Sequence, residues 1–294
     1  AIGGVIQVFT RRPAGAGARP RARIGVGSHD LREASAGIGF GSQAAWLDTD
    51  VAYQRTDGIN SCKGFLDPVT FAGAGCFILP DSQPDLDGYR NRSASVRGGL
   101  HPDEAWTLEA SALRAEGDNE YDGDFFDSSE VVQQVVGGTV RYAPDPDLAL
   151  KLVAGSHLDS SDNFLQGSFT DSFSSRRDSA TLQGDFGIAA GQLLTLGVDW
   201  LRDRGNIFGP FAAYDRERGN RAGFAQYQGK FGRHDLEAAL RHDDNDQFGG
   251  HTTGSAAWGF EFGDGLRATA SYGTAFKAPN FNELYYPFFG NPDL

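Results

Sequence analysis

The chain has 294 residues, of which 39% are hydrophobic, 12% are aromatic and 40 are glycine, and its net charge is −13. This negative charge argues against a nucleic-acid partner, because phosphate binding requires clustered Lys and Arg side chains. No apolar run approaches the roughly 18 to 20 residues of a transmembrane helix, which excludes a helical membrane protein. A membrane β-barrel stays open, because its strands alternate polar and apolar residues and look polar on average.

The first 13 residues, AIGGVIQVFTRRP, do not look like the start of a protein. The sequence contains no Met, and no basic region precedes a small-residue cleavage site, so this stretch is not a signal peptide. A Gly-Gly turn leads directly into an apolar, strand-like run from Val5 to Thr10. We expect this strand to pair with a segment that precedes it in a longer protein.

A period of two runs through most of the chain and predicts strands with one apolar and one polar face. From Leu266 to Lys277, for example, apolar and small polar or charged residues alternate. No convincing helix of more than a few turns is found. We predict thirteen strands, at 18–27, 32–41, 46–56, 90–100, 105–116, 130–142, 148–158, 177–189, 193–203, 218–231, 234–244, 252–262 and 266–277. Most are longer than the usual five or six residues and match the about 9 to 11 that cross a bilayer at a tilt.

Short and long connections alternate between these strands. The short ones are 101–105, 144–147, 190–192, 232–233 and 263–265, and the long ones are about 57–89, 117–129, 159–176, 204–217 and 245–251. Outer-membrane barrels have this layout, with short periplasmic turns and long extracellular loops. Trp46, Trp106, Trp200 and Trp258 lie near strand ends, where they could form interfacial girdles. A soluble barrel is the alternative, but it would fill its interior with apolar side chains.

An odd number of strands points to an incomplete wall. Single-chain bacterial barrels close with even numbers, and an open edge in lipid leaves a row of unpaired backbone groups. We therefore expect further strands outside this chain.

Two stretches carry a resemblance to TonB-dependent outer-membrane receptors. AIGGVIQVFTRRP is similar to the last segment of the plug domain in that family, and SYGTAFKAPNFNELYYPFFGNPDL, at 271–294, is similar to a mid-barrel stretch. The resemblance implies that residues 1–13 end a plug domain. It further implies that residues 14–294 form the N-terminal, incomplete part of an all-β, membrane-spanning antiparallel up-and-down β-barrel, with about 13 of about 22 strands.

The same resemblance implies surroundings and partners. The protein would lie in the bacterial outer membrane, among lipid and lipopolysaccharide. An inner-membrane TonB protein would energise it through an N-terminal region that this chain lacks. No residue pattern of a catalytic centre is found, such as a G-x-S-x-G elbow between a strand and a helix, so we expect no enzymatic activity.

Within the family, the chain is most similar to the cobalamin receptors. The segments that carry this likeness are 82–89, 236–262 and 271–294. The predicted function is energy-coupled uptake of a large, scarce ligand, cobalamin or a related corrinoid. A ferric-siderophore receptor of the same family is the alternative, and a passive porin or adhesin is a second one. The plug-like first stretch argues against the latter.

Acidic residues cluster in two of the long connections. Asp85 and Asp87 precede the turn residue Gly88, and the stretch EGDNEYDGDFFD contains Asp118. Alternating carboxylates in loops suit an oxygen-seeking cation such as calcium. The resemblance implies that these loops bind calcium, with Asp85 and Asp87 as the first candidates, followed by Asp118 and Asn60. The alternative is a solvated acidic loop that binds no ion.

Two further groups of residues are candidates for structure and recognition. Cys62 and Cys76 have no His or Cys partners at metal-site spacing, so a disulfide closing a surface loop is predicted, with two free thiols as the alternative. Aromatic residues in the connections predict contacts with a large, partly apolar ligand, and loop-on-loop packing is the alternative. These aromatic candidates are Phe125, Phe126, Phe208, Tyr214, Tyr285 and Tyr286.

Overall fold

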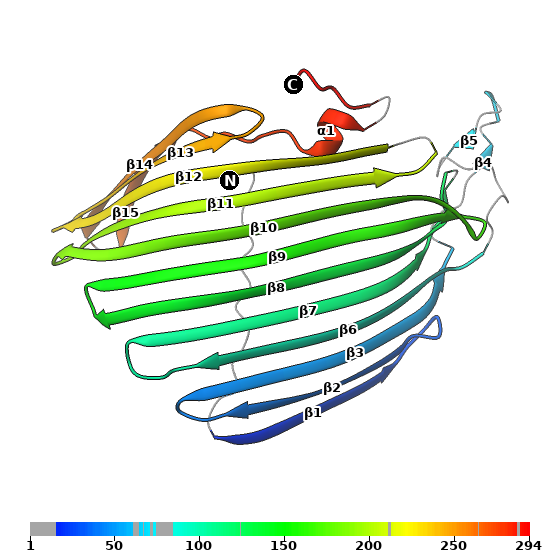
Figure 1. The fold of residues 1–294 in the computed structure, drawn as a ribbon, viewed down its shortest axis with the longest axis horizontal. Coiled ribbons are helices and arrows are strands. Elements are labelled where there is room, and N and C mark those ends of the chain that lie inside the picture. The colour runs from blue at the N-terminus through cyan, green and yellow to red at the C-terminus, as the bar shows by residue number, and fades with distance from the viewer. Residues whose placement is uncertain are drawn as a thin grey trace.

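The computed structural model describes residues 16–60, 65–66, 68–70, 73–74, 85–123, 125–210, 213–263, 265–286 and 289–294. Within these ranges, thirteen strands form one antiparallel sheet in which each strand pairs with the next along the chain (Figure 1). The strands are β1 (Gly17–Val26), β2 (Arg32–Gly41), β3 (Ala45–Ile59), β6 (Asp87–Leu100), β7 (Trp106–Glu120), β8 (Ser128–Asp145), β9 (Leu148–Leu165), β10 (Ser168–Ala189), β11 (Gln192–Phe208), β12 (Ala213–Phe231), β13 (His234–Asn245), β14 (Gly249–Gly263) and β15 (Leu266–Gly273). A small pair, β4 (Phe65–Leu66) and β5 (Gly73–Ala74), and one helix, α1 (Phe281–Tyr285), complete the elements.

The thirteen predicted strands are all present, but several predicted loops are in fact strand. The connection expected at 159–176 is a hairpin in which β9 and β10 meet at a two-residue turn. Gln166 and Gly167 form this turn with positive φ angles of 50° and 74°. The extended part of the hairpin carries polar side chains, such as Asn163, which donates to Asp171. It therefore lacks the apolar alternation from which the other strands were predicted.

The register of the strands separates the side chains into two faces. On the apolar face, Leu108, Val140, Leu152, Leu182 and Val198 form one continuous row across five strands. One residue away along each strand, the polar face carries the row Glu109, Thr139, Val153, Thr181 and Asp199. A sheet that faces lipid on one side and an aqueous lumen on the other has this arrangement.

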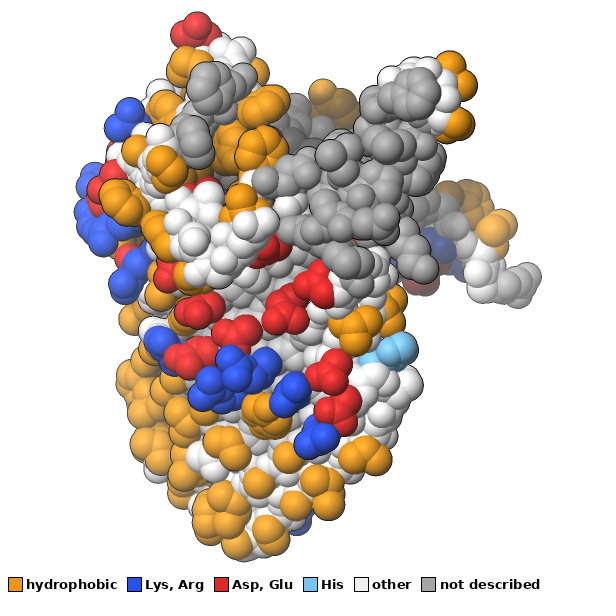
Figure 2. Space-filling model, turned by 90° about the vertical axis from the view of Figure 1, so that its right-hand side faces the viewer, with side chains coloured by type: hydrophobic (Ala, Val, Ile, Leu, Met, Phe, Trp, Pro, Cys, Tyr) orange, Lys and Arg blue, Asp and Glu red, His pale blue; other side chains and the backbone are white. Residues whose placement is uncertain are grey.

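Charged side chains gather on the polar face. Figure 2 views the end of the molecule where the wider connections lie and shows acidic and basic side chains in a band bordered by hydrophobic ones. Asp48, which is almost fully buried, accepts hydrogen bonds from Arg21 at 2.5 Å and from Arg97 at 2.8 Å. Across the sheet, Arg177 donates to Asp203 at 2.6 Å. Because these pairs join different strands, they tie the sheet together on its polar side.

The described part of the chain has a very small apolar core. Its buried hydrophobic side chains are Ile207, Tyr214, Ala222 and Leu284, and all of them belong to α1 or to β11 and β12. The rest of the sheet has no packed core, so it depends on the hydrogen bonds between its strands and on the lipid that its apolar face is suited to contact. No helix among the described residues is long and apolar enough to cross a membrane.

The last strand ends earlier than predicted. β15 stops at Gly273 rather than near Lys277. The N–H of Thr274 still donates to the Gly254 carbonyl, but the Gly254 N–H donates to the Thr274 hydroxyl at 3.0 Å instead of to a backbone carbonyl. The chain then leaves the sheet, passes Pro279 and forms α1. In Figure 1 this helix lies beside β12, towards the rim with the wider connections.

Candidate ligand-binding rim

Helix α1 is fixed to the sheet by polar contacts with β12 and with the β13–β14 connection. Tyr214 donates its hydroxyl to Asn282 at 2.7 Å, and Gln247 donates its amide to the Tyr285 hydroxyl at 2.7 Å. Leu284, at 1% exposure, fills the space beneath the helix. A five-residue helix would be unstable alone, so these contacts determine that it forms here.

Arg218 is the central contact of this assembly. Its Nη1 donates to the Pro279 carbonyl at 2.8 Å, which holds the residue immediately before the helix cap. Its guanidinium also lies 5.1 Å from the ring of Phe281 and 5.6 Å from the ring of Phe248. A buried arginine that contacts two aromatic rings combines a hydrogen bond with cation–π attraction.

A glycine allows α1 to approach the sheet closely. A Cβ at Gly205 would lie 2.6 Å from the nearest ring carbon of Phe281, which is too close for any side chain. Gly205 therefore makes room for the ring of Phe281 against β11.

A reciprocal cap starts the helix. Asn280 accepts from the Glu283 N–H at 2.8 Å, and Glu283 accepts from the Asn280 N–H at 2.6 Å. The hydrogen bond from the Asn280 backbone, followed by the ion pair with Lys277 at 3.2 Å, lowers the pKa of the Glu283 carboxyl from its usual value. The helix start is therefore best formed when this carboxylate is ionised.

Of the six aromatic candidates at this rim, three are exposed and three are packed against neighbouring side chains. Phe125 and Phe208 are 76% and 64% exposed, and Tyr286 is also exposed. Tyr214 is only 8% exposed and anchors α1, so little of its ring is free to touch a ligand. Phe126 contacts Tyr121 edge to face at 6.3 Å, and Tyr285 stacks beneath the Arg216 guanidinium at 4.9 Å.

The acidic candidates are only partly brought together. Asp87 pairs with Ile59, which places it beside Asn60 at the end of the β3–β6 ladder, and Asp85 is exposed just before it. Asp118 pairs instead with Arg90 at 2.5 Å. Since Tyr89 lies opposite Asn119 in the register, Asp87 and Asp118 point to opposite faces of the sheet. The residues that the structure describes contain no group of three acidic, His or Cys side chains that could hold a metal ion.

Other predicted features lie outside the described residues. These are the opening segment 1–13, with its strand at Val5 to Thr10 and its assignment to a plug, and the two cysteines, Cys62 and Cys76. The plug boundary and the disulfide both stay predictions.

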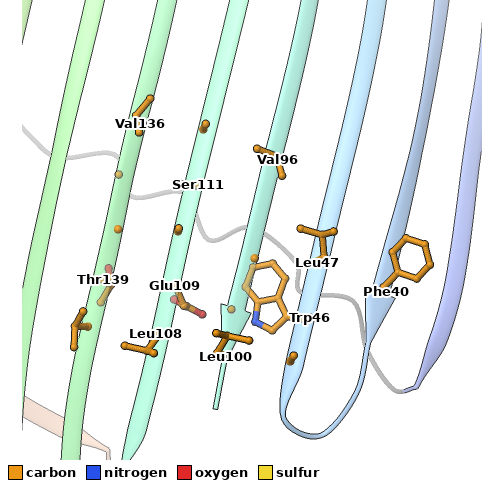
Figure 3. Close-up of a pocket in the computed structure, with 18 of the residues that line it drawn as sticks. Phe40, Trp46, Leu47, Val96, Leu100, Leu108, Glu109, Ser111, Val136 and Thr139 are labelled. Atoms are coloured by element: carbon orange, nitrogen blue, oxygen red, sulfur yellow. The ribbon is translucent and has the colours of Figure 1, made fainter. Parts of the chain in front are cut away.

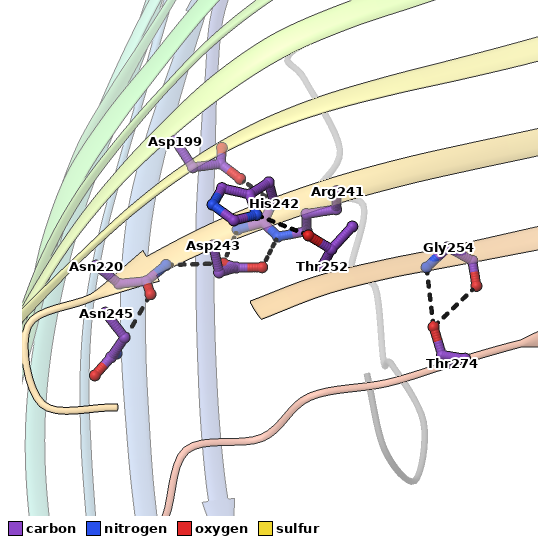
Figure 4. A network of polar contacts seen from close by, with 9 residues as sticks. All are labelled: Asp199, Asn220, Arg241, His242, Asp243, Asn245, Thr252, Gly254 and Thr274. Carbon is purple, nitrogen blue, oxygen red and sulfur yellow. Dashed lines mark hydrogen bonds and ion pairs between the residues drawn. The ribbon is translucent and has the colours of Figure 1, made fainter. Parts of the chain in front are cut away.

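A network of polar side chains joins β11, β12 and β13 on the polar face (Figure 4). Arg241 bonds to Asp199 and, through two nitrogens at 2.9 Å, to Asp243. Asn220 donates to the same Asp243 at 2.9 Å. The segment 241–251, which spans the end of the predicted strand 234–244 and the predicted long connection 245–251, thus supplies structural ion pairs. It is strand on both sides of a short turn.

Sequence reasoning missed most residues that build this rim. Asn280 and Glu283 could have been found, because N-x-x-E directly after a proline is a capping-box pattern. Arg218 gave no such signal, since an arginine in an alternating strand looks like any other lumen residue.

Comparison with known proteins decides the family. Residues 34–294 match the family described as "TonB dependent receptor-like, beta-barrel". The chain belongs to this family. The predicted fold class, a barrel wall of antiparallel strands, is therefore confirmed, as is the outer-membrane location that the family implies. The prediction that the chain is not an enzyme agrees with a family of transport receptors.

Curated relatives match the whole chain. The chain is 26% identical over 298 residues to the "Vitamin B12 transporter BtuB" of Photobacterium profundum. It is 31% identical over 316 residues to the protein of the same name from Vibrio cholerae serotype O1. Both matches cover 100% of this chain and 46% of the relative, so the chain spans about half the length of these relatives.

Solved structures confirm the fold. The ferric enterobactin receptor of Pseudomonas aeruginosa superimposes with a TM-score of 0.73 at 16% identity, over 94% of this chain and 46% of that one. The siderophore receptor PirA of the same organism gives a TM-score of 0.67 at 16% identity, over 92% and 45%. At this level of identity the likeness concerns the fold alone.

Proposed function

We propose that this chain forms part of the wall of an outer-membrane receptor that imports cobalamin or a related corrinoid. The observation that carries the proposal is the match of the entire chain to curated proteins named as vitamin B12 transporters, at 26% to 31% identity. A sheet with one apolar and one charged face suits a wall between lipid and a water-filled lumen.

The proposed receptor is larger than this sheet. β1 and β15 each pair on one side only among the described strands, and in a bilayer their free backbone groups need partners. Further strands, about 22 in all, would close the wall. Residues 1–13 would end a plug domain inside it, and a TonB protein of the inner membrane would act on a region that precedes the plug.

The ligand would enter at the rim that carries α1. Phe125, Phe208 and Tyr286 offer exposed aromatic surface there, and large ligands with apolar edges gain affinity from such contacts. Tyr214 and Tyr285 would act indirectly, because their hydrogen bonds with Asn282 and Gln247 hold α1 in place.

Calcium would bind at the start of β6. Asp85, Asp87 and Asn60 are the candidate ligands that lie near one another, whereas Asp118 is paired with Arg90. Replacing Asp85 and Asp87 with Ala should abolish any gain in corrinoid affinity on adding calcium, measured by titration with and without a chelator. Equal gains in the variant and the unmodified receptor would show that the acidic segment is merely solvated.

Transport is tested in cells that lack their own corrinoid receptor. Cells that make the receptor should accumulate labelled cyanocobalamin, and deleting the TonB protein should stop accumulation. Uptake that persists without TonB would favour a passive porin. A ferric-siderophore receptor is the second candidate, supported only by the shared fold of the ferric enterobactin receptor.

A further inference from the structure

A groove crosses the apolar face of the sheet over β3 and β6 to β9 (Figure 3). Its volume of about 1020 Å³ reaches the upper end of the roughly 300 to 1,000 Å³ typical of small-molecule sites. Its floor is one row of small residues that pair across four strands: Gly98, Ala110, Gly138 and Ala154. Because strands lie about 4.8 Å apart, this floor is roughly 14 Å long.

Larger apolar side chains flank the floor on both sides. The row nearer the short turns consists of Leu100, Leu108, Val140 and Leu152. Val96 and Val136 stand in the row on the other side, and the three rows are each about 6.6 Å apart. The result is a trough with apolar walls, which suits an extended hydrocarbon chain.

Aromatic residues show at which depth of the bilayer the trough lies. Trp106 and Tyr142 pair on the same face, with ring centroids 4.6 Å apart, one row nearer the short turns than Leu108 and Val140. Such rings mark the membrane interface, and short turns mark the periplasmic side. The trough therefore begins just inside the periplasmic interface and faces the hydrocarbon of the periplasmic leaflet.

The turns below the trough are acidic. The turn at 101–105 contains Asp103 and Glu104, and Asp145, the last residue of β8, is followed by Asp147 in the turn to β9. Neither turn contains Lys or Arg. Asp103 and Asp145 accept backbone N–H groups of their own turns, whereas Glu104 is exposed. A headgroup that carries an ammonium ion is attracted to these acidic turns, and a purely anionic headgroup is repelled.

We propose that this groove binds the acyl chains of one phospholipid with an ethanolamine headgroup, taken from the periplasmic leaflet. The chains lie over the glycine and alanine floor, and the ammonium group lies at the acidic turns. The proposed transport does not require this lipid site, so the test of the lipid site is independent of which ligand the receptor imports.

The test places larger side chains on the floor of the groove and measures how many phospholipids stay bound to the receptor. The complete receptor is purified from outer membranes in mild detergent, and bound phospholipids are counted by native mass spectrometry. Ala110→Leu combined with Ala154→Leu should reduce retained phosphatidylethanolamine about tenfold, because the added side chains occupy the floor. Both alanines are exposed on the apolar face, so the larger side chains meet no packed core.

Matched controls separate this site from general loss of lipid. Ala238→Leu combined with Ala256→Leu adds the same side chains at an exposed pair on the same face, between β13 and β14, and should retain the lipid. Heat-modifiable migration confirms that each variant is folded. The proposal would be overturned if the groove variant and the unmodified receptor retained equal amounts of phosphatidylethanolamine, or if both variants lost it equally. It would also be overturned if filling the groove dissociated a receptor dimer and left the bound lipid unchanged.

A second arm tests the headgroup. Glu104→Gln combined with Asp147→Asn removes two carboxylates from the acidic turns and leaves the side chains of the trough unchanged. In nanodiscs with equal phosphatidylethanolamine and phosphatidylglycerol, the unmodified receptor should retain mainly the former, and the variant should retain similar amounts of both. A receptor that retains both lipids equally before mutation contradicts the assigned headgroup.

Discussion

At the scale of single residues, the rim depends on a few side chains that hold α1 against the sheet. Arg218 donates to the Pro279 carbonyl and contacts the rings of Phe281 and Phe248, so one arginine links β12, the β13–β14 connection and the helix start. Buried hydrogen bonds from charged groups contribute about 1.5–3 kcal/mol, far more than exposed ones.

Replacing Arg218 with Ala should release α1. We expect its backbone amides to exchange with solvent roughly 10- to 100-fold faster, as follows from losing about 1.5–3 kcal/mol locally. Hydrogen exchange read by mass spectrometry over 274–286 measures this. Arg216→Ala is the control, because this exposed side chain contributes only about 0.5–1 kcal/mol through the Tyr285 ring. Similar effects of the two substitutions would contradict the central role of Arg218.

Replacing Gly205 with Ala should also loosen the helix. The new Cβ would lie 2.6 Å from the Phe281 ring, which must move away and give up its packing against β11. Gly223→Ala on neighbouring β12 is the matched control, since a Cβ there meets no atom within 4 Å. Faster exchange of α1 is expected for the first variant only, and unchanged exchange in both would show that α1 does not need this close approach.

At the scale of elements, the sequence pattern predicts strands best where one face meets lipid. All thirteen strands were predictable from their alternation, because a period of two follows from the pleat. The polar extension of β9 and β10, around Asn163 and Asp171, was not, since side chains on both of its faces meet water. Helix α1 was hidden for another reason: its five residues are too few for a helical period, although its cap at Asn280 and Glu283 is visible.

The cap makes the start of α1 sensitive to acid. Because the folded-state pKa of Glu283 is lower than its unfolded value near 4.5, its contribution is present above that value. It is lost as the pH falls through the lower, folded-state pKa. Exchange or proteolysis of 274–286 should therefore accelerate as the pH falls below about 4.5, beyond the intrinsic pH effect. Glu283→Gln keeps a capping side chain without a titratable proton and should remove this acceleration. An unaltered profile in that variant would mean that another group titrates.

At the scale of the whole molecule, architecture and location follow from pattern, whereas ligand identity does not. Thirteen antiparallel strands, most of them long enough to cross a bilayer and with alternating apolar and polar residues, indicate an outer-membrane wall before any comparison. The ligand depends on a few side chains at the rim, such as Phe208 and Tyr286, whose types carry no periodic signal. Similarity to curated transporters over the full chain supplies that step for the proposed function.

The most direct test of the proposed function is a calorimetric titration of the complete receptor with cyanocobalamin, with and without calcium. The proposal predicts saturable one-to-one binding that strengthens when calcium is present. Ferric enterobactin, titrated in parallel, should give no heat of binding. Absence of cyanocobalamin binding under both conditions, together with saturable binding of the ferric siderophore, would contradict it.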